Sequence, residues 1–251
     1  MKNAFIITSA AWALFSWLPN QAYAEGSWLD NGVSILNNLT KETGGKSSNT
    51  TSDAEVGEAF KQALRIGTEN VVSKLGTVDG FNADPTVHIP LPKDLKTIKT
   101  LLTQVGMSQL ADDLELKLNR AAESATQKAK THFLQAITDM TFNDIRNIYE
   151  GPENSATKYF QSKMSSPLAQ EMQPIVKNTL SQVGAIQAYE QVIGQYNTLP
   201  FVPDVTTNLT DHVIQKGLEG IFFYVAKEEA SIRKDPAKQT TVLLKKVFGI
   251  Q

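Results

Sequence analysis

Most of the chain alternates amphipathic helical stretches with short breaks that contain glycine, proline or polar residues. Between residues 53 and 249, apolar residues recur mainly at three- and four-residue spacing, which is the period of a helix rather than a strand. The first stretch follows Ser52-Asp-Ala-Glu55, a spacing that predicts a capping box, and it ends at Gly76. The pattern therefore predicts an all-α domain.

The longest uninterrupted stretch runs from Ser108 to Met140 without proline or glycine. Its apolar seam has an alanine-rich middle, which predicts a long central helix that its neighbours approach closely. Proline and glycine positions divide the rest of the chain into shorter helices. We expect a single multi-helix bundle of about nine or ten helices, with the others at about residues 53–75, 92–105, 141–149, 154–164, 167–184 (kinked at Pro174), 185–196, 209–234 and 236–248.

Two features of the breaks add detail. The segment Thr77 to Pro92 is the longest irregular stretch of the domain, and only Thr86 to Ile89 resembles a strand. The segments Leu102–Gln109 and Leu180–Gln187 are similar, and recurrence of one helix–glycine–helix turn explains this better than a duplication.

Two glycines also lie inside a predicted helix. Gly217 and Gly220 are three residues apart on one face, and they indicate close helix packing rather than access for a ligand.

The first residues have the pattern of a secretory signal peptide. Lys2 precedes an apolar run from Ala4 to Leu18, and Ala22-Tyr23-Ala24 is a small-x-small cleavage site, so we expect residues 1–24 to be removed. Residues 25–52 then comprise a short amphipathic helix, Trp28 to Leu39, and a polar flexible linker, and residues 53–251 form the helical domain. The expected location is the periplasm, with secretion as the alternative, and no transmembrane span is expected in the mature chain.

The amino-acid composition excludes several kinds of functional site. The 251 residues contain no cysteine, which excludes disulfides, thiolate metal sites and a thiol nucleophile. The net charge of −2 and the scattered lysines give no electrostatic footprint for nucleic acid. His88, His132 and His212 lie on separate predicted elements without ligand spacing, so neither a metal nor another cofactor is expected.

The candidate site rests on the few arginines. The chain has only Arg65, Arg120, Arg146 and Arg233 among 24 basic residues. Arg120 lies three residues before Glu123, beside the alanine seam, where the pair either ties the helix to its neighbours or forms an anion-binding or acid–base site. The structural interpretation is the more common origin of such clusters. The ligand-binding candidates are Asp79, Gly80, Phe81, Asn119, Arg120 and Glu123.

Ordered blocks of residues resemble a bacterial family, domain of unknown function 4197, over roughly Ser52 to Gly249. The resemblance is carried by Leu75-Gly76-x-x-Asp79-Gly80-Phe81, Ile89-Pro90-Leu91-Pro92, Asn119-Arg120-Ala-Ala-Glu123, Ala156-Thr157-x-Tyr159-Phe160 and Glu229-x-x-Ile232-Arg233-x-Asp235-Pro236. It implies an exported, all-helical protein and no established activity.

Three functional hypotheses follow. The first is an exported, non-enzymatic binding or envelope-associated protein that holds an anionic or amphiphilic ligand, or an envelope protein, with the candidate residues above. The second is a hydrolase- or lyase-type enzyme with Glu123 or His132 as base and Arg120 holding an oxyanion; the missing nucleophile motifs favour a protein that is not an enzyme. The third is a structural interaction protein that docks through Trp28 to Leu39.

Overall fold

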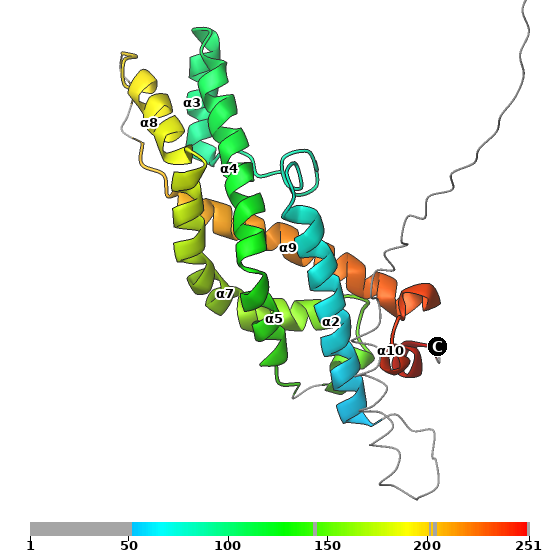
Figure 1. Ribbon diagram of the computed structural model, residues 1–251. Helices are drawn as coiled ribbons and strands as arrows, with labels where there is room; N and C mark the ends of the chain where they lie inside the picture. Colours follow the sequence, from blue (N-terminus) through cyan, green and yellow to red (C-terminus); the bar gives the residue numbers. More distant parts are fainter. Residues whose placement is uncertain (1–51, 143–144, 201, 203–204, 250–251) are drawn as a thin grey trace, which may run out of the picture. The chain divides into compact units, whose positions relative to one another are not determined.

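The computed structural model describes residues 52–142, 145–200, 202 and 205–249, and every regular element within these ranges is helical (Figure 1). The predicted all-α bundle is confirmed. The predicted signal peptide, and all of the predicted helix and linker except Ser52, lie outside the described residues. The helices are α2 (Asp53–Leu75), α3 (Lys93–Gln104), α4 (Ser108–Lys128), α5 (Lys130–Thr138), α6 (Ile145–Tyr149), α7 (Ser155–Gln182), α8 (Ala185–Tyr196), α9 (Leu209–Lys234), a 3₁₀ turn η1 (Pro236–Lys238) and α10 (Val242–Phe248).

The predicted start of α2 is correct in detail. The Ser52 hydroxyl accepts a hydrogen bond from the backbone N–H of Glu55 at 3.2 Å, and the Glu55 carboxylate accepts one from the N–H of Ser52 at 3.0 Å. This capping box satisfies two of the N–H groups that a helix start leaves without partners.

The long central helix is divided at Ala129 into α4 and α5, so the expectation of one helix from Ser108 to Met140 is wrong there. Neither proline nor glycine causes the break. Both parts pack against α7, but the other main neighbour of α4 is α8, whereas that of α5 is α2. A change of direction at Ala129 lets both apolar seams reach their partners, and tertiary packing thus overrides helix propensity.

Two predicted helices on either side of Ser166-Pro167 are instead one helix, α7, which contains both Pro167 and Pro174. A proline inside a helix costs about 3 kcal/mol. Burial of apolar side chains offsets the cost of the two prolines, because Phe160, Leu168 and Met172 of α7 are almost inaccessible to solvent.

The closing helix is also interrupted. Asp235 caps only the short turn η1, and α10 starts after Thr241, whose hydroxyl accepts a hydrogen bond from the N–H of Leu244 at 3.2 Å. The similar corners between α3 and α4 and between α7 and α8 both turn at a left-handed glycine, with φ of 76° at Gly106 and at Gly184. The two similar segments thus share their turn geometry, as recurrence of one turn chemistry would predict.

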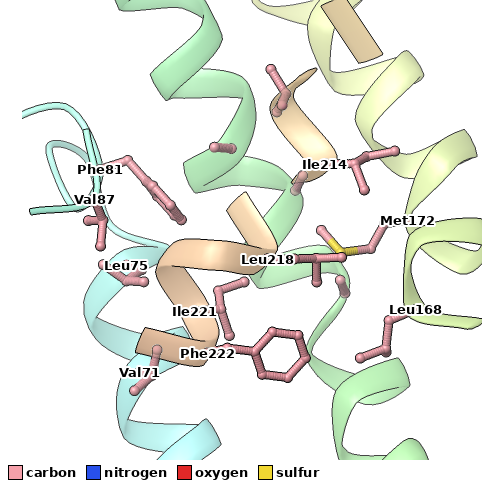
Figure 2. Packing of buried hydrophobic residues seen from close by; sticks show 14 of the residues in the cluster. Val71, Leu75, Phe81, Val87, Leu168, Met172, Ile214, Leu218, Ile221 and Phe222 are labelled. Atoms are coloured by element: carbon pink, nitrogen blue, oxygen red, sulfur yellow. The ribbon is translucent and has the colours of Figure 1, made fainter. Parts of the chain in front are cut away.

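Helix α9 runs across α2, α4 and α7 and contacts all three (Figure 1). The core lies at these crossings. Figure 2 shows apolar side chains from α2, α7, α9 and the 76–92 loop converging on it, among them Val71, Leu75, Phe81, Val87, Leu168, Met172, Ile214, Leu218, Ile221 and Phe222. Within the described ranges, no helix is both long and apolar enough to cross a membrane.

Candidate functional site

The six predicted site residues lie together where the 76–92 loop meets α4. Asp79, Gly80 and Phe81 belong to the loop, and Asn119, Arg120 and Glu123 belong to α4. We call Asp79, Asn119, Arg120 and Glu123 the loop clamp, because their side chains bind the loop to the helix.

Asn119 holds the end of the loop. Its side-chain oxygen accepts a hydrogen bond from the N–H of Ile89 at 2.8 Å, and its side-chain nitrogen donates to the carbonyl of Ile89 at 2.9 Å. Asn119 is fully buried. The side chain thus supplies the paired bonds that a neighbouring strand would offer, and the strand-like piece predicted at residues 86–89 forms no strand.

Glu123 holds the start of the loop. One carboxylate oxygen accepts hydrogen bonds from the N–H groups of Phe81 at 3.2 Å and Asn82 at 3.1 Å. The other oxygen accepts one from Arg120 at 2.8 Å, and Arg120 also donates to Asp79 at 2.8 Å. The bond to Glu123, followed by that to Asp79, raises the pKa of Arg120, while bonds from Asn82 and Arg120 lower the pKa of Asp79.

The three loop residues have steric roles. Asp79 adopts a left-handed φ of 68°, which is uncommon for a residue with a side chain. A Cβ atom at Gly80 would lie 2.4 Å from the carbonyl oxygen of Leu75, so only glycine fits there. Phe81 is fully buried, and a Cβ atom at Gly220 of α9 would come within 3.1 Å of its ring. Gly220 therefore lets the loop approach α9, whereas a Cβ at Gly217 would meet nothing within 4 Å.

The loop clamp is an internal network with little capacity for an anion. Arg120 faces two carboxylates, so the cluster formed by Arg120, Asp79 and Glu123 carries a net charge of −1 when ionised. An added anion would have to displace an existing partner of Arg120. The contacts favour the structural interpretation of the arginine cluster, and a ligand-binding role for these residues stays a prediction.

The three histidines lie apart. His88 contacts the Asn82 carbonyl and the Glu115 carboxylate, each at 2.9 Å. His132 lies 2.9 Å from Glu171, and His212 lies 2.8 Å from the Pro90 carbonyl. Burial lowers the pKa of His212. Across the described parts of the chain, no three histidine or acidic side chains are grouped so that they could hold a metal ion.

A second buried carboxylate was not among the sequence candidates. Glu229 of α9 is fully buried and accepts hydrogen bonds from the N–H groups of Ala156 at 3.1 Å and Thr157 at 2.7 Å in the first turn of α7. Arg233, one turn later, donates to Glu229 at 2.8 Å and lies 4.4 Å from the ring centre of Phe60. The pairing of Glu229 with Arg233 four residues later is the sequence signal that could have indicated this site.

A surface hollow lies elsewhere, between α7 and α9, and has a volume of about 610 Å³. We call it the α7–α9 groove. Ala169, Ile214, Leu218 and Phe222 form its apolar part, and amide, hydroxyl and carboxylate groups form the rest. The polar lining residues are Gln161, Ser165, Ser166, Gln170, Gln173, Asp211, Gln215 and Glu219. The sequence did not indicate this site, because its α7 side spans Pro167, where a new helix was expected to begin.

Comparison with known families gives one match, to the family DUF4197, described as a protein of unknown function, over residues 50–249. No curated protein and no solved structure matches the chain.

Proposed function

Because the chain belongs to the DUF4197 family, whose description states no activity, we propose a function from the site: an exported, non-enzymatic envelope protein that holds an amphiphilic ligand in the α7–α9 groove. The groove itself is the observation that carries the proposal. Its volume of about 610 Å³ lies within the usual size of ligand pockets, roughly 300–1,000 Å³.

The surface chemistry of the groove suits a ligand with both apolar and polar parts. Leu218 and Phe222 offer apolar contact at its base, and Figure 2 shows their side chains beside Met172 and Leu168 of α7. Exposed amides and hydroxyls from α7 surround this base. An apolar base with a few convergent polar groups is the common pattern of binding sites.

The loop clamp supports binding at the groove rather than catalysis at Glu123. A catalytic base must be reachable by a substrate proton. Glu123 is instead only 3% exposed, and both its oxygens accept hydrogen bonds from the protein. Arg120 likewise already bonds to two carboxylates.

Export is supported by the first 24 residues. Lys2, the apolar run to Leu18 and Ala22-Tyr23-Ala24 have the order of a signal peptide. The absence of cysteine suits an oxidising compartment, where a free thiol is a liability.

Native mass spectrometry of the protein purified from its own envelope tests the proposal. We expect a co-purifying ligand on the wild type that is lost in Ala169→Trp, because the indole would fill the groove. Ala226→Trp is the matched control, since Ala226 is half-buried like Ala169 but lines a separate hollow beside Phe223. Only the unliganded mass in the wild type, or equal retention by both variants, would contradict the proposal.

A further inference from the structure

We propose that the α7–α9 groove binds an extended peptide segment of a partner protein, and that this segment is uncharged or basic. The inference rests on the proposed function, since it names the chemical class of the ligand that the groove holds. Four features of the groove carry it.

The first feature is a row of unused polar side chains on α7. Gln161, Ser165 and Gln173 lie on a four-residue repeat, and Ser166 and Gln170 form the adjacent row. None of these five side chains makes a hydrogen bond or ion pair within the described part of the chain. A glutamine amide offers a donor and an acceptor, as a peptide group does, so a row of them matches the backbone of an extended chain.

The second feature is a backbone acceptor at the same place. Pro174 has no N–H, so the carbonyl of Gln170 cannot receive the helical hydrogen bond from that position. Gln170 itself lines the groove. A carbonyl that lacks its helical donor can accept a hydrogen bond from water or from a peptide N–H.

The third feature is the shape and chemistry of the apolar base. Ile214 and Leu218 are aliphatic, and Phe222 meets Phe160 edge to face, with ring centres 5.6 Å apart. Only 4% of Phe222 is exposed, so it offers no broad aromatic face to a sugar ring. Such a base accommodates aliphatic or other apolar side chains of a peptide.

The fourth feature is charge. Asp211 and Glu219 line the groove, and no lysine or arginine among the described residues does. Lys216 neutralises Glu219 at 2.6 Å, but the Asp211 carboxylate bonds only to the neutral amide of Asn208, also at 2.6 Å. The groove therefore repels an acidic segment and attracts a basic one.

The geometry also sets the length of the segment. From Gln161 to Gln173 the helix rises by roughly 18 Å at 1.5 Å per residue. An extended chain covers that distance with about six residues, at about 3.3 Å each. A segment of this length would place alternate side chains over the apolar base.

Two pools of fluorescent, end-blocked random hexapeptides test the inference by fluorescence anisotropy with the mature protein. Lysine is the only charged residue in one pool, and glutamate is the only one in the other. We expect the lysine pool to bind about tenfold more tightly, which corresponds to one favourable charge contact. Added salt should narrow this difference.

A double variant, Gln170→Ala with Gln173→Ala, should weaken binding of the lysine pool by about tenfold, because it removes two polar contacts. The matched control is Gln187→Ala with Gln191→Ala on α8, where both residues are exposed, and it should bind as the wild type does. Thermal melts should show that both double variants remain folded.

Binding of neither pool, or equal binding of the two, would overturn the peptide inference, as would equal losses in the two double variants. The proposed function would survive that outcome if a lipid co-purified with the wild type and was lost in Ala169→Trp. Absence of any ligand from both experiments would contradict both proposals.

Discussion

Glu123 and Glu229 are buried carboxylates with the same arrangement. Each accepts hydrogen bonds from two consecutive backbone N–H groups of a distant segment, and each pairs with an arginine on its own helix. The partners are Arg120, three residues before Glu123, and Arg233, four residues after Glu229. Two of the chain's four arginines thus help to join segments far apart in sequence.

We predict that Glu123→Ala lowers the free energy of unfolding by about 3 kcal/mol, because it leaves two backbone N–H groups without their acceptor and removes one of the two carboxylates that pair with Arg120. Glu229→Ala should lower the free energy of unfolding further, by about 4 kcal/mol, since Arg233 is more deeply buried than Arg120. Urea denaturation at neutral pH measures both.

Glu58→Ala is the control for these two variants. The Glu58 side chain is 67% exposed, and its ion pair with Lys61 is 3.9 Å long. We expect a change below about 0.5 kcal/mol. A similarly small loss for Glu123→Ala would show that the loop clamp does not hold the loop.

A second residue-scale prediction concerns pH. Burial lowers the pKa of His212 in the folded protein, with Lys216 and Lys96 acting in the same direction and Glu219 and the Pro90 carbonyl opposing them. As the pH falls through about 6.5, the unfolded chain therefore takes up this proton first, and stability decreases until the folded pKa is reached.

We expect His212→Gln to lessen the loss of stability between about pH 7.5 and the lower pKa of the folded histidine. Chemical denaturation of both proteins across this range gives the difference in the free energy of unfolding between them. Parallel stability curves for the two proteins would be inconsistent with this account.

At the scale of the helices, capping and turn residues predicted where a helix starts or turns better than they predicted whether two helical stretches form one continuous helix. The capping box at Ser52 and the glycine corners at Gly106 and Gly184 depend on neighbouring residues alone. The break at Ala129 and the continuity of α7 through Pro167 depend instead on which helix each face meets. No local pattern carries that information.

The same distinction explains what could be predicted of the sites. The six candidate residues were found together because their chemistry is concentrated in two short blocks, at residues 79–81 and 119–123. The α7–α9 groove was missed because a helix boundary placed at Pro167 separated Gln161 from Gln173. Once α7 is one helix, these side chains share a face.

Two glycines of α9 give a prediction at this scale. Gly220→Ala would place a Cβ atom 3.1 Å from both Phe81 and Val87, so we expect a loss of about 1–3 kcal/mol from overpacking. Gly217→Ala meets nothing within 4 Å and should gain up to about 1 kcal/mol of helix propensity.

Thermal or urea denaturation should show a lower free energy of unfolding for Gly220→Ala and a higher one for Gly217→Ala than for the wild type. The sequence alone suggested the same role for both glycines, close packing of helices. Destabilisation by Gly217→Ala equal to that of Gly220→Ala would restore that interpretation.

At the scale of the whole molecule, the proposed export predicts a defined mature protein. Intact mass spectrometry of the protein from the periplasmic fraction should find Glu25 as the first residue, because Ala22-Tyr23-Ala24 forms the cleavage site. Replacing Ala24 with a bulky residue such as phenylalanine should leave the precursor uncleaved. A mature chain that retains Met1 would contradict the proposed route.

The bonds between Glu229 and the first turn of α7 also govern when the core can close. The acceptor follows Thr157 by 72 residues, and Phe248, whose ring centre lies 5.2 Å from that of Phe60, is later still. A ribosome adds residues from the amino end, so α2 and α7 are made well before these partners. A nascent chain that stops short of Phe248 lacks an aromatic side chain that packs against Phe60, so the core can be completed only after α10 has been made.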